Sequence, residues 1–233
     1  MEGVRYAGQF PAEGLLCSPC RTAPPEFERA VAYAAYEDEL REMVQLLKYE
    51  RVAALAEPMG RMLARAIETL EGEAAKELVV VAVPLFPAKE RRRGYNQAVL
   101  IADAAIVELK MRRPEWGLRA AHRAMQRVKD TESQFGLTPR QRRLNLRNAF
   151  EVVDPAAVVW REVLLVDDIY TTGATGRACS KALLQAGATK VWVATVSRAQ
   201  VETVVMWNAA ASTAAVGMPD RDELKLRDFR GQC

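Results

Sequence analysis

Two adjacent carboxylates, Asp167 and Asp168, directly follow a run of four large apolar residues at positions 163–166. Such a run is typical of a parallel strand that is covered on both faces. Because ligands in open α/β sheets bind beyond the carboxyl ends of the strands, we expect these acids to face a ligand and not the core. Ionised carboxylates accept hydrogen bonds, so the acid pair is suited to bind two neighbouring hydroxyl groups.

The residues after the acid pair predict a phosphate-binding turn. They are small and rich in hydroxyl groups, and they lead into a predicted helix at 174–186 that ends before Gly187. Backbone N–H groups at such a turn, with the positive end of the helix dipole behind them, form a seat for a phosphate group. An acid pair beside this seat indicates a site for a ribose 5-phosphate. The residues of this phosphate loop are Thr171, Thr172, Gly173, Ala174 and Thr175.

The same residues have a purely structural alternative, in which the acids only cap the following turn and Gly173 supplies an unusual dihedral angle. The presence of the whole loop favours the ligand site over this alternative. Other phosphate loops are excluded by spacing, since the chain contains neither G-x-x-x-x-G-K-[ST] nor G-x-G-x-x-G.

The strand, the acid pair and the T-T-G-A-T loop resemble the signature of the type I phosphoribosyltransferases. This resemblance implies an α/β fold with a twisted, mostly parallel sheet that is flanked by helices and covered by a mobile hood loop. It also implies that Asp167 and Asp168 hold the ribose 2- and 3-hydroxyls of phosphoribosyl pyrophosphate, while residues 171–175 hold its 5-phosphate.

A second group of motifs resembles the ComF-type proteins associated with bacterial DNA uptake. Residues 78–83 predict another buried strand, and P-L-F-P at 84–87 and R-R-R-G-Y-N-Q at 91–97 follow it. L-K-Y at 47–49 and several residues between Arg127 and Phe150 also match, so the resemblance covers roughly residues 30 to 198. It implies a role in natural competence.

A turn flanked by cations follows the strand at 78–83, and it suits a pyrophosphate group, which carries several negative charges. We assign pyrophosphate binding to the turn at 85–89, with two residues further along as additional candidates. The alternative is a solvated basic turn leading into a helix that Asn96 caps, and this is the preferred interpretation for Arg91 and Arg92. The candidates are Leu85, Phe86, Lys89, Arg93 and Asn96.

Residues 125–146 form a polar stretch without apolar periodicity, which is typical of a lid or a disordered loop. The resemblance implies that this stretch is the hood, with Arg127 and Lys129 delivering positive charge to the departing pyrophosphate. Thr138 and Pro139 predict a short helix at 139–146. The arginines of that helix fit a ligand-binding face and a solvated face equally well.

Two functions follow from these motifs. The first is a phosphoribosyltransferase, a glycosyltransferase in which pyrophosphate leaves the anomeric carbon and a nitrogen nucleophile attacks it, with magnesium as the expected cofactor. No side chain stands out as a general base, so the sequence leaves the acceptor open. The second is a non-catalytic competence protein that senses the precursor or binds single-stranded DNA through arginines 91–93 and 140–147. Partners from the competence machinery and an oligomer are compatible with both.

Composition agrees with an anionic ligand. The chain has 233 residues, of which 50% are hydrophobic, enough for one core with small appendages. It lacks an apolar stretch of membrane-spanning length and a signal-peptide core, so we expect a cytoplasmic protein. Residues 89–147 contain 15 Lys or Arg and 6 Asp or Glu, whereas the remainder contains 18 and 24. This basic middle suits pyrophosphate or a nucleic-acid strand.

Three segments are expected: an N-terminal segment at 1–25, a phosphoribosyltransferase-like domain at 26–200 and a loosely attached tail at 201–233. Cys17 and Cys20 have the spacing of half a zinc ribbon, but a structural zinc site needs four ligands, so we expect no bound metal in this chain. His122, the single histidine, is expected to be a surface or packing residue.

Alternating strands and helices predict a parallel sheet with right-handed crossovers. The expected elements are an edge strand or helix start at 30–36, helices at 38–48, 52–70, 97–110 and 174–186, and strands at 78–83, 118–124, 163–166 and 190–197.

Overall fold

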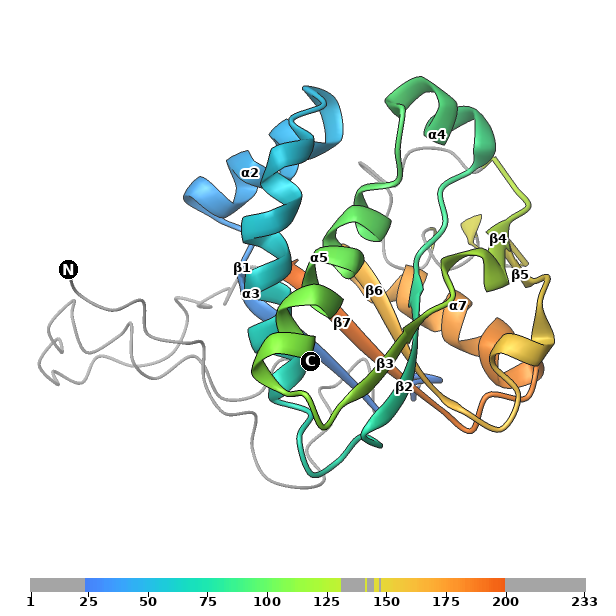
Figure 1. Ribbon diagram of the computed structural model, residues 1–233. Coiled ribbons are helices and arrows are strands. Elements are labelled where there is room, and N and C mark those ends of the chain that lie inside the picture. Colours follow the sequence, from blue (N-terminus) through green and yellow to red (C-terminus); the bar gives the residue numbers. More distant parts are fainter. Residues whose placement is uncertain (1–23, 131–140, 142–144, 147, 200–233) are drawn as a thin grey trace, which may run out of the picture. The chain divides into compact units, whose positions relative to one another are not determined.

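A parallel sheet of five strands, in the order β1-β7-β6-β2-β3, forms the centre of the described part of the chain (Figure 1). The computed structural model describes residues 24–130, 141, 145, 146 and 148–199. The long strands β6 and β7 lie in the middle of the sheet, and β1 and β3 form its edges. The strands are β1 (Arg29–Ala35), β2 (Glu77–Ala82), β3 (Gly117–Ala120), β6 (Glu162–Tyr170) and β7 (Lys190–Arg198).

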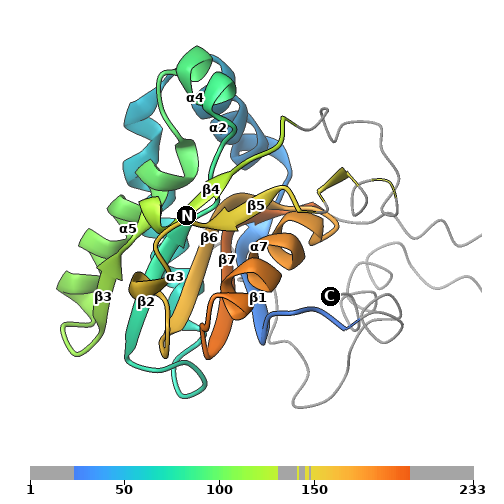
Figure 2. The ribbon, with the colours of Figure 1, turned by 90° about the vertical axis from the view of Figure 1, so that its right-hand side faces the viewer.

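Helices cover both faces of this sheet. Helices α3 and α5 pack against one face, whereas α7 and a separate antiparallel pair, β4–β5, lie on the other (Figures 1 and 2). In the described ranges, no helix combines the length and the apolar character needed to span a membrane. The remaining elements are α2 (Asp38–Tyr49), α3 (Ala56–Glu68), α4 (Pro87–Arg93), α5 (Gln97–Arg112), α7 (Ala174–Gln185), β4 (Met125–Arg127), β5 (Phe150–Val152) and 3-10 turns at Ala53–Leu55, His122–Ala124 and Pro155–Ala157.

The apolar strands are explained by two separate cores, one on each face of the sheet. In β6, Leu164 and Val166 belong to the core beneath α3 and α5, whereas Val163 and Leu165 belong to the core beneath α7. Successive residues of a strand point to opposite faces, so a sheet buried on both sides needs apolar residues without interruption. The predicted fold class, α/β with a mostly parallel sheet flanked by helices, is confirmed.

Most predicted elements are present, with shifts at their ends. The ambiguous stretch at 30–36 is strand β1, which pairs in parallel with β7 and is therefore an edge strand. The predicted strand at 118–124 is only four residues long, because the chain turns at His122–Ala124 and continues as β4. The predicted helix at 52–70 is shorter and begins with a 3-10 turn.

One helix was missed, because the basic turn continues directly into α4. Pro87 occupies the start of this helix, where its missing N–H group costs nothing, and Gly94 ends it with a left-handed φ of 91°. The helix is only seven residues long, so no apolar stripe marks it in the sequence. The predicted N-terminal segment, the tail, Cys17, Cys20 and most of the predicted helix at 139–146 lie outside the described residues.

Candidate functional site

The acid pair lies where β6 continues past the end of its neighbour β2. Strand β6 pairs with β2 only as far as Val166, opposite Ala82, but it pairs with β7 as far as Tyr170. The sequence therefore predicted the end of this strand four residues too early. Beyond Val166 one edge of β6 is open, and this opening lies at the carboxyl ends of the strands, where ligands bind in open α/β sheets.

The two acids leave the strand on opposite faces. Asp168 is 2% exposed and its Oδ2 atom lies 2.8 Å from the Nζ atom of Lys48, at the end of α2. Asp167 belongs to the face of α7 and β4, and its Oδ1 atom accepts a hydrogen bond of 2.9 Å from the backbone N–H of Asp168. This bond turns the Asp167 carboxyl back toward its neighbour.

The pKa values of Asp167 and Lys48 are shifted by burial and by their charged neighbours. Burial, and then the negative charge of Asp168, raise the pKa of Asp167 to about 7, while the Lys48 ammonium group opposes the shift. Burial alone would lower the pKa of Lys48, but the pKa is raised because Asp168, through its charge and its hydrogen bond, and Asp167 outweigh that effect. Asp167 therefore exchanges a proton near neutral pH, as groups at functional sites often do.

Strand β4 brings a further charge near Asp167. Arg127, on β4, packs its guanidinium group 5.4 Å from the ring centroid of Phe150 on β5. Burial lowers the pKa of Arg127, against the opposing influence of the thiol of Cys179 and the charges of Asp167 and Asp130. Arg127 is therefore close enough to interact with Asp167, whereas Lys129, just beyond β4, is exposed. The predicted role of both residues at a leaving pyrophosphate stays a prediction.

The phosphate loop begins α7 without a side-chain cap. Gly173 is the N-cap residue of α7, and its left-handed φ of 71° is one that favours glycine. Glycine has no side chain with which to cap α7, and the N–H groups of the first turn of a helix can bind an anion. The hydroxyl of Thr172 is buried and has no hydrogen-bond partner among the described residues. Both features fit a phosphate group.

The ring of Tyr170 packs against the phosphate loop at Gly173. Its ring lies edge-on to Phe27, with centroids 6.5 Å apart, and the guanidinium group of Arg198 lies 5.5 Å from its centroid. A Cβ atom at Gly173 would overlap the hydroxyl of Tyr170 and lie 2.8 Å from its Cζ atom. The loop therefore needs glycine for its dihedral angle and for its contact with Tyr170.

The pyrophosphate-binding candidates at 85–89 lie close to the end of β4. Leu85, Phe86 and Lys89 are half-buried or more exposed, and Lys89 Nζ lies 3.7 Å from an Asp130 carboxylate oxygen, just beyond β4.

Arg93 instead contacts α5 and α2. Its guanidinium group donates to Gln97 Oε1 and lies 5.8 Å from the ring centroid of Tyr49. Asn96 is 6% exposed and fills the predicted capping role: its Oδ1 accepts from the N–H of Ala98 at 3.0 Å, and its Nδ2 donates to the carbonyl of Val83 at 2.9 Å. A contact of either residue with a ligand stays a prediction.

Comparison with known proteins decides the family. The DNA utilization protein YhgH of Escherichia coli K12 is 32% identical over 183 residues, which cover 77% of this chain and 76% of that protein. The competence protein F of Haemophilus influenzae is 30% identical over 187 residues, which cover 78% of each. The chain belongs to the ComF family of competence proteins. No protein-family model matches it.

Two solved structures match this ComF-family chain with lower sequence identity. The Bacillus subtilis glutamine phosphoribosylpyrophosphate amidotransferase, complexed with ADP and GMP, aligns over 59% of the chain and 25% of its own, with 24% identity and a TM-score of 0.34. The protein TT1426 from Thermus thermophilus aligns over 64% of the chain and 84% of its own, with 19% identity and a TM-score of 0.32.

Sequence reasoning missed two buried neighbours of the acid pair in this ComF-family chain. Lys48 follows Val44 by four residues and so continues the apolar stripe of α2, which is the signal that could have revealed it. Cys179, on α7, is fully buried, and burial, together with the charge of Asp167, raises the pKa of its thiol well above the ordinary value. A thiol in this state is unreactive.

His122 has a packing role in this ComF-family chain. Its Nδ1 accepts a hydrogen bond of 3.1 Å from the backbone N–H of Ala82, so the neutral ring carries its proton on Nε2, which lies 3.0 Å from an Asp103 carboxylate oxygen. The ring thus pairs the last N–H group of β2, just before the basic turn.

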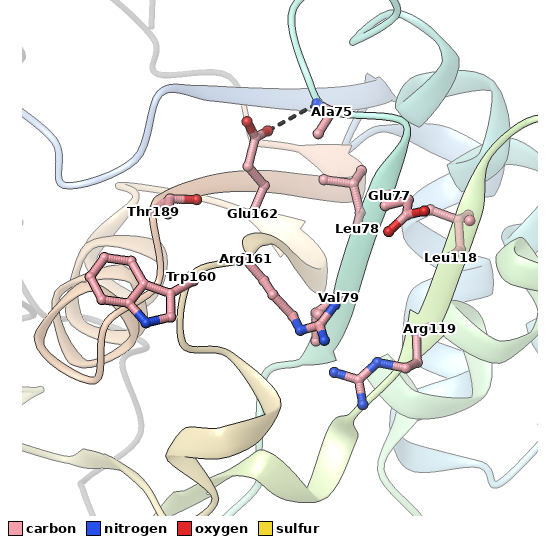
Figure 3. Close-up of a pocket in the computed structure, with 11 residues that line it drawn as sticks. Ala75, Glu77, Leu78, Val79, Leu118, Arg119, Trp160, Arg161, Glu162 and Thr189 are labelled. Carbon is pink, nitrogen blue, oxygen red and sulfur yellow. Dashed lines mark hydrogen bonds between the residues drawn. The ribbon is translucent and has the colours of Figure 1, made fainter.

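A cavity of about 560 Å³ opens at the other end of the sheet, where β2, β3 and β6 begin (Figure 3). Trp160 and Arg161 lie on one side of it, and Arg119 and Glu77 on another. Glu162 accepts hydrogen bonds from the N–H of Ala75 at 2.9 Å and from Trp192 at 2.8 Å. The lining of this cavity contains both arginines and glutamates, so its charges favour no single class of ligand. We therefore place the candidate site at the acid pair, Asp167 and Asp168.

Replacing Gly173 by alanine should reduce stability more than the same change at Gly94. Both residues have a left-handed φ, which costs an alanine about 1–2 kcal/mol. Only Gly173→Ala adds a clash, with Tyr170, because nothing lies within 4 Å of a Cβ atom at Gly94. Urea unfolding should give an additional loss of about 1 kcal/mol or more for Gly173→Ala. Equal losses in the two variants would contradict the close packing of Tyr170.

Asp167→Asn should stabilise the protein at alkaline pH. The folded chain holds the Asp167 proton up to about pH 7, whereas the unfolded chain releases it near 3.8, so ionising this buried acid lowers the free energy of unfolding as the pH rises between these values. Asparagine cannot ionise, so the variant should gain stability over the parent as the pH rises from about 5 to about 8. Thermal unfolding measures this difference, with Asp154→Asn, at an exposed acid, as the control. A constant difference across that range would mean that Asp167 is not perturbed.

Proposed function

We propose that this chain binds phosphoribosyl pyrophosphate with magnesium at the carboxyl end of β6 and that it is a phosphoribosyltransferase-like protein of the competence system. The observation that carries the proposal is the adjacency of the acid pair and the start of α7, whose N-cap residue is Gly173. Two acceptors and the first N–H groups of a helix lie within one short stretch, from Asp167 to Ala174. A ribose 5-phosphate offers the complementary groups, two hydroxyls and one anion.

Each part of the ligand has a group of residues assigned to it. Asp167 and Asp168 accept hydrogen bonds from the ribose 2- and 3-hydroxyls, and the backbone of residues 171–175 binds the 5-phosphate. The basic turn at 85–89 and Arg127 bind the pyrophosphate from two sides. The 3.7 Å contact between Lys89 and Asp130 supports this last assignment, because it brings the basic turn and the hood together.

The chemistry follows from this arrangement. Departure of pyrophosphate leaves positive charge on the ribosyl carbon, and the carboxylates stabilise that charge while they fix the sugar. Arg127 carries positive charge toward the leaving group, and the buried surroundings of the acid pair limit the access of water. Magnesium, when bound, neutralises pyrophosphate charge; it keeps several waters and needs few protein ligands, so the oxygen-rich site fits it. The acceptor is a nitrogen nucleophile that no residue identifies.

The relatives support the biological role. Their names assign them to DNA utilization and competence, and we extend the same role to this chain. A second candidate function, binding of single-stranded DNA, is favoured by Arg91 and Arg92, which are exposed on α4 beside the basic turn. Such cations bind phosphates irrespective of base sequence.

Calorimetric titration with phosphoribosyl pyrophosphate tests the first function. The parent should bind in a magnesium-dependent manner, and affinity should fall as the pH is lowered through about 7, because protonation removes the negative charge that makes Asp167 a strong acceptor. Asp167→Asn should bind at least about tenfold more weakly at about pH 8. The ligand itself titrates, so the difference between the two pH profiles isolates Asp167. Asp154→Asn should match the parent; the absence of heat from the parent, with and without magnesium, would refute the function.

Salt dependence tests the second function. If α4 contacts DNA phosphates, the logarithm of the affinity for an oligonucleotide should fall with the logarithm of the salt concentration by about 0.7 per contact. The double variant Arg91→Ala and Arg92→Ala should then lose about 1.4 units of slope, whereas removal of two exposed lysines elsewhere, Lys76 and Lys110, should not change it. A slope that is unchanged in both double variants would exclude α4 as the DNA-binding element.

A further inference from the structure

Lys48 is a charged residue on the buried face of α2. The neighbouring positions Val44 and Leu47 are 1% and 0% exposed, and they pack in the core beneath α3 and α5. The Lys48 side chain is 17% exposed, and its ammonium group ends 2.8 Å from Asp168, itself 2% exposed. A buried ion pair contributes little net stability compared with apolar residues of the same size. The presence of lysine in this stripe therefore calls for a role at the acid pair.

The end of α2 is held in place independently of Asp168. The hydroxyl of Tyr95 donates a hydrogen bond of 2.6 Å to the carbonyl of Leu47. The guanidinium group of Arg51 donates one of 2.6 Å to the carbonyl of Arg92, near the end of α4. Residues 47–51 therefore join the acid pair to the helix that follows the basic turn. The backbone that carries Lys48 is thus held from outside the acid pair.

We propose that Lys48 is a positioning residue of the candidate site, whose ammonium group binds one oxygen of Asp168 and orients the other oxygen toward a ribose hydroxyl. The inference rests on the proposed function of this site. An ionised carboxylate offers about four lone-pair positions, so one oxygen can bind Lys48 while the other accepts from the ligand. Without the ammonium group, burial and the neighbouring carboxylate favour the protonated form of Asp167 more strongly, and the acid pair becomes a weaker acceptor for the ligand hydroxyls.

Titratable groups from three parts of the structure surround the acid pair and its cations. Helix α2 supplies Lys48 and Tyr49, the segment that begins with β4 supplies Arg127 and Asp130, and α7 supplies the thiol of Cys179. Among these groups, Lys48 is the one whose charge lowers the pKa of Asp167 against burial and Asp168. Removing the positive charge of Lys48 should therefore leave Asp167 protonated up to a higher pH.

The test compares Lys48→Met with Lys48→Arg in calorimetric titrations with phosphoribosyl pyrophosphate and magnesium from about pH 6.5 to about pH 9. Lys48→Met keeps the apolar stem and removes the charge, so binding at about pH 7 should be about tenfold weaker or more, one unit of pKa being a factor of about ten. The loss should shrink as the pH rises and the acids ionise. Lys48→Arg should retain most of the affinity, because it keeps the cation, and the exposed Lys110→Met should match the parent.

Proton counting gives a second measurement. Titrations in two buffers of different ionisation enthalpy should show that Lys48→Met releases more protons on binding near neutral pH than the parent does. A residue that only supports the fold would leave this number unchanged.

The outcomes separate this inference from the proposed function. If the parent binds and Lys48→Met binds equally well, or is weakened equally at every pH with no added proton release, the positioning role is overturned while the function stands. If the parent does not bind, the function itself falls. Should Lys48→Met fail to fold, Lys48→Arg decides in its place, because its pH profile and proton count should follow the parent; a pH-independent loss of binding in that variant would overturn the role.

Discussion

The unequal length of the two neighbours of β6 determines the rest of the site. Strand β7 supports β6 as far as Tyr170, whereas β2 ends opposite Val166. Backbone pairing on one side holds the acid pair in place, and on the other side β2 does not pair with residues 167–170. A strand with no partner on either edge would not hold its side chains in place.

The site combines features that oppose stability. Alternation along β6 sends Asp168 toward the core beneath α3 and α5, and Asp167 toward α7. Each acid then meets a cation from a different element, Lys48 from α2 and Arg127 from β4. Burial of like charges is costly, and the raised pKa of Asp167 records that cost. Functional sites commonly sacrifice stability in this way.

Local patterns revealed the central strands, the acid pair and the phosphate loop, because each of these depends on residues adjacent in sequence. The full length of β6 was not predictable, since β7, a separate strand beyond α7, stabilises positions 167–170. Helix α4 is too short to show periodicity, and its boundaries depend on Pro87 and Gly94. Lys48 was recognised only as part of L-K-Y, because its role arises from a contact with Asp168, far away along the chain.

The hydrogen bonds of residues 47–51 have a consequence for ligand size. This segment contacts Asp168 through Lys48 and the end of α4 through Arg51, so it holds one region in place relative to the other. A molecule that spans both regions bears the entropic cost of association once, whereas two separate fragments would each bear it. The intact precursor should therefore bind more favourably than its sugar phosphate and its diphosphate moiety taken singly, which gives the protein a way to ignore both breakdown products.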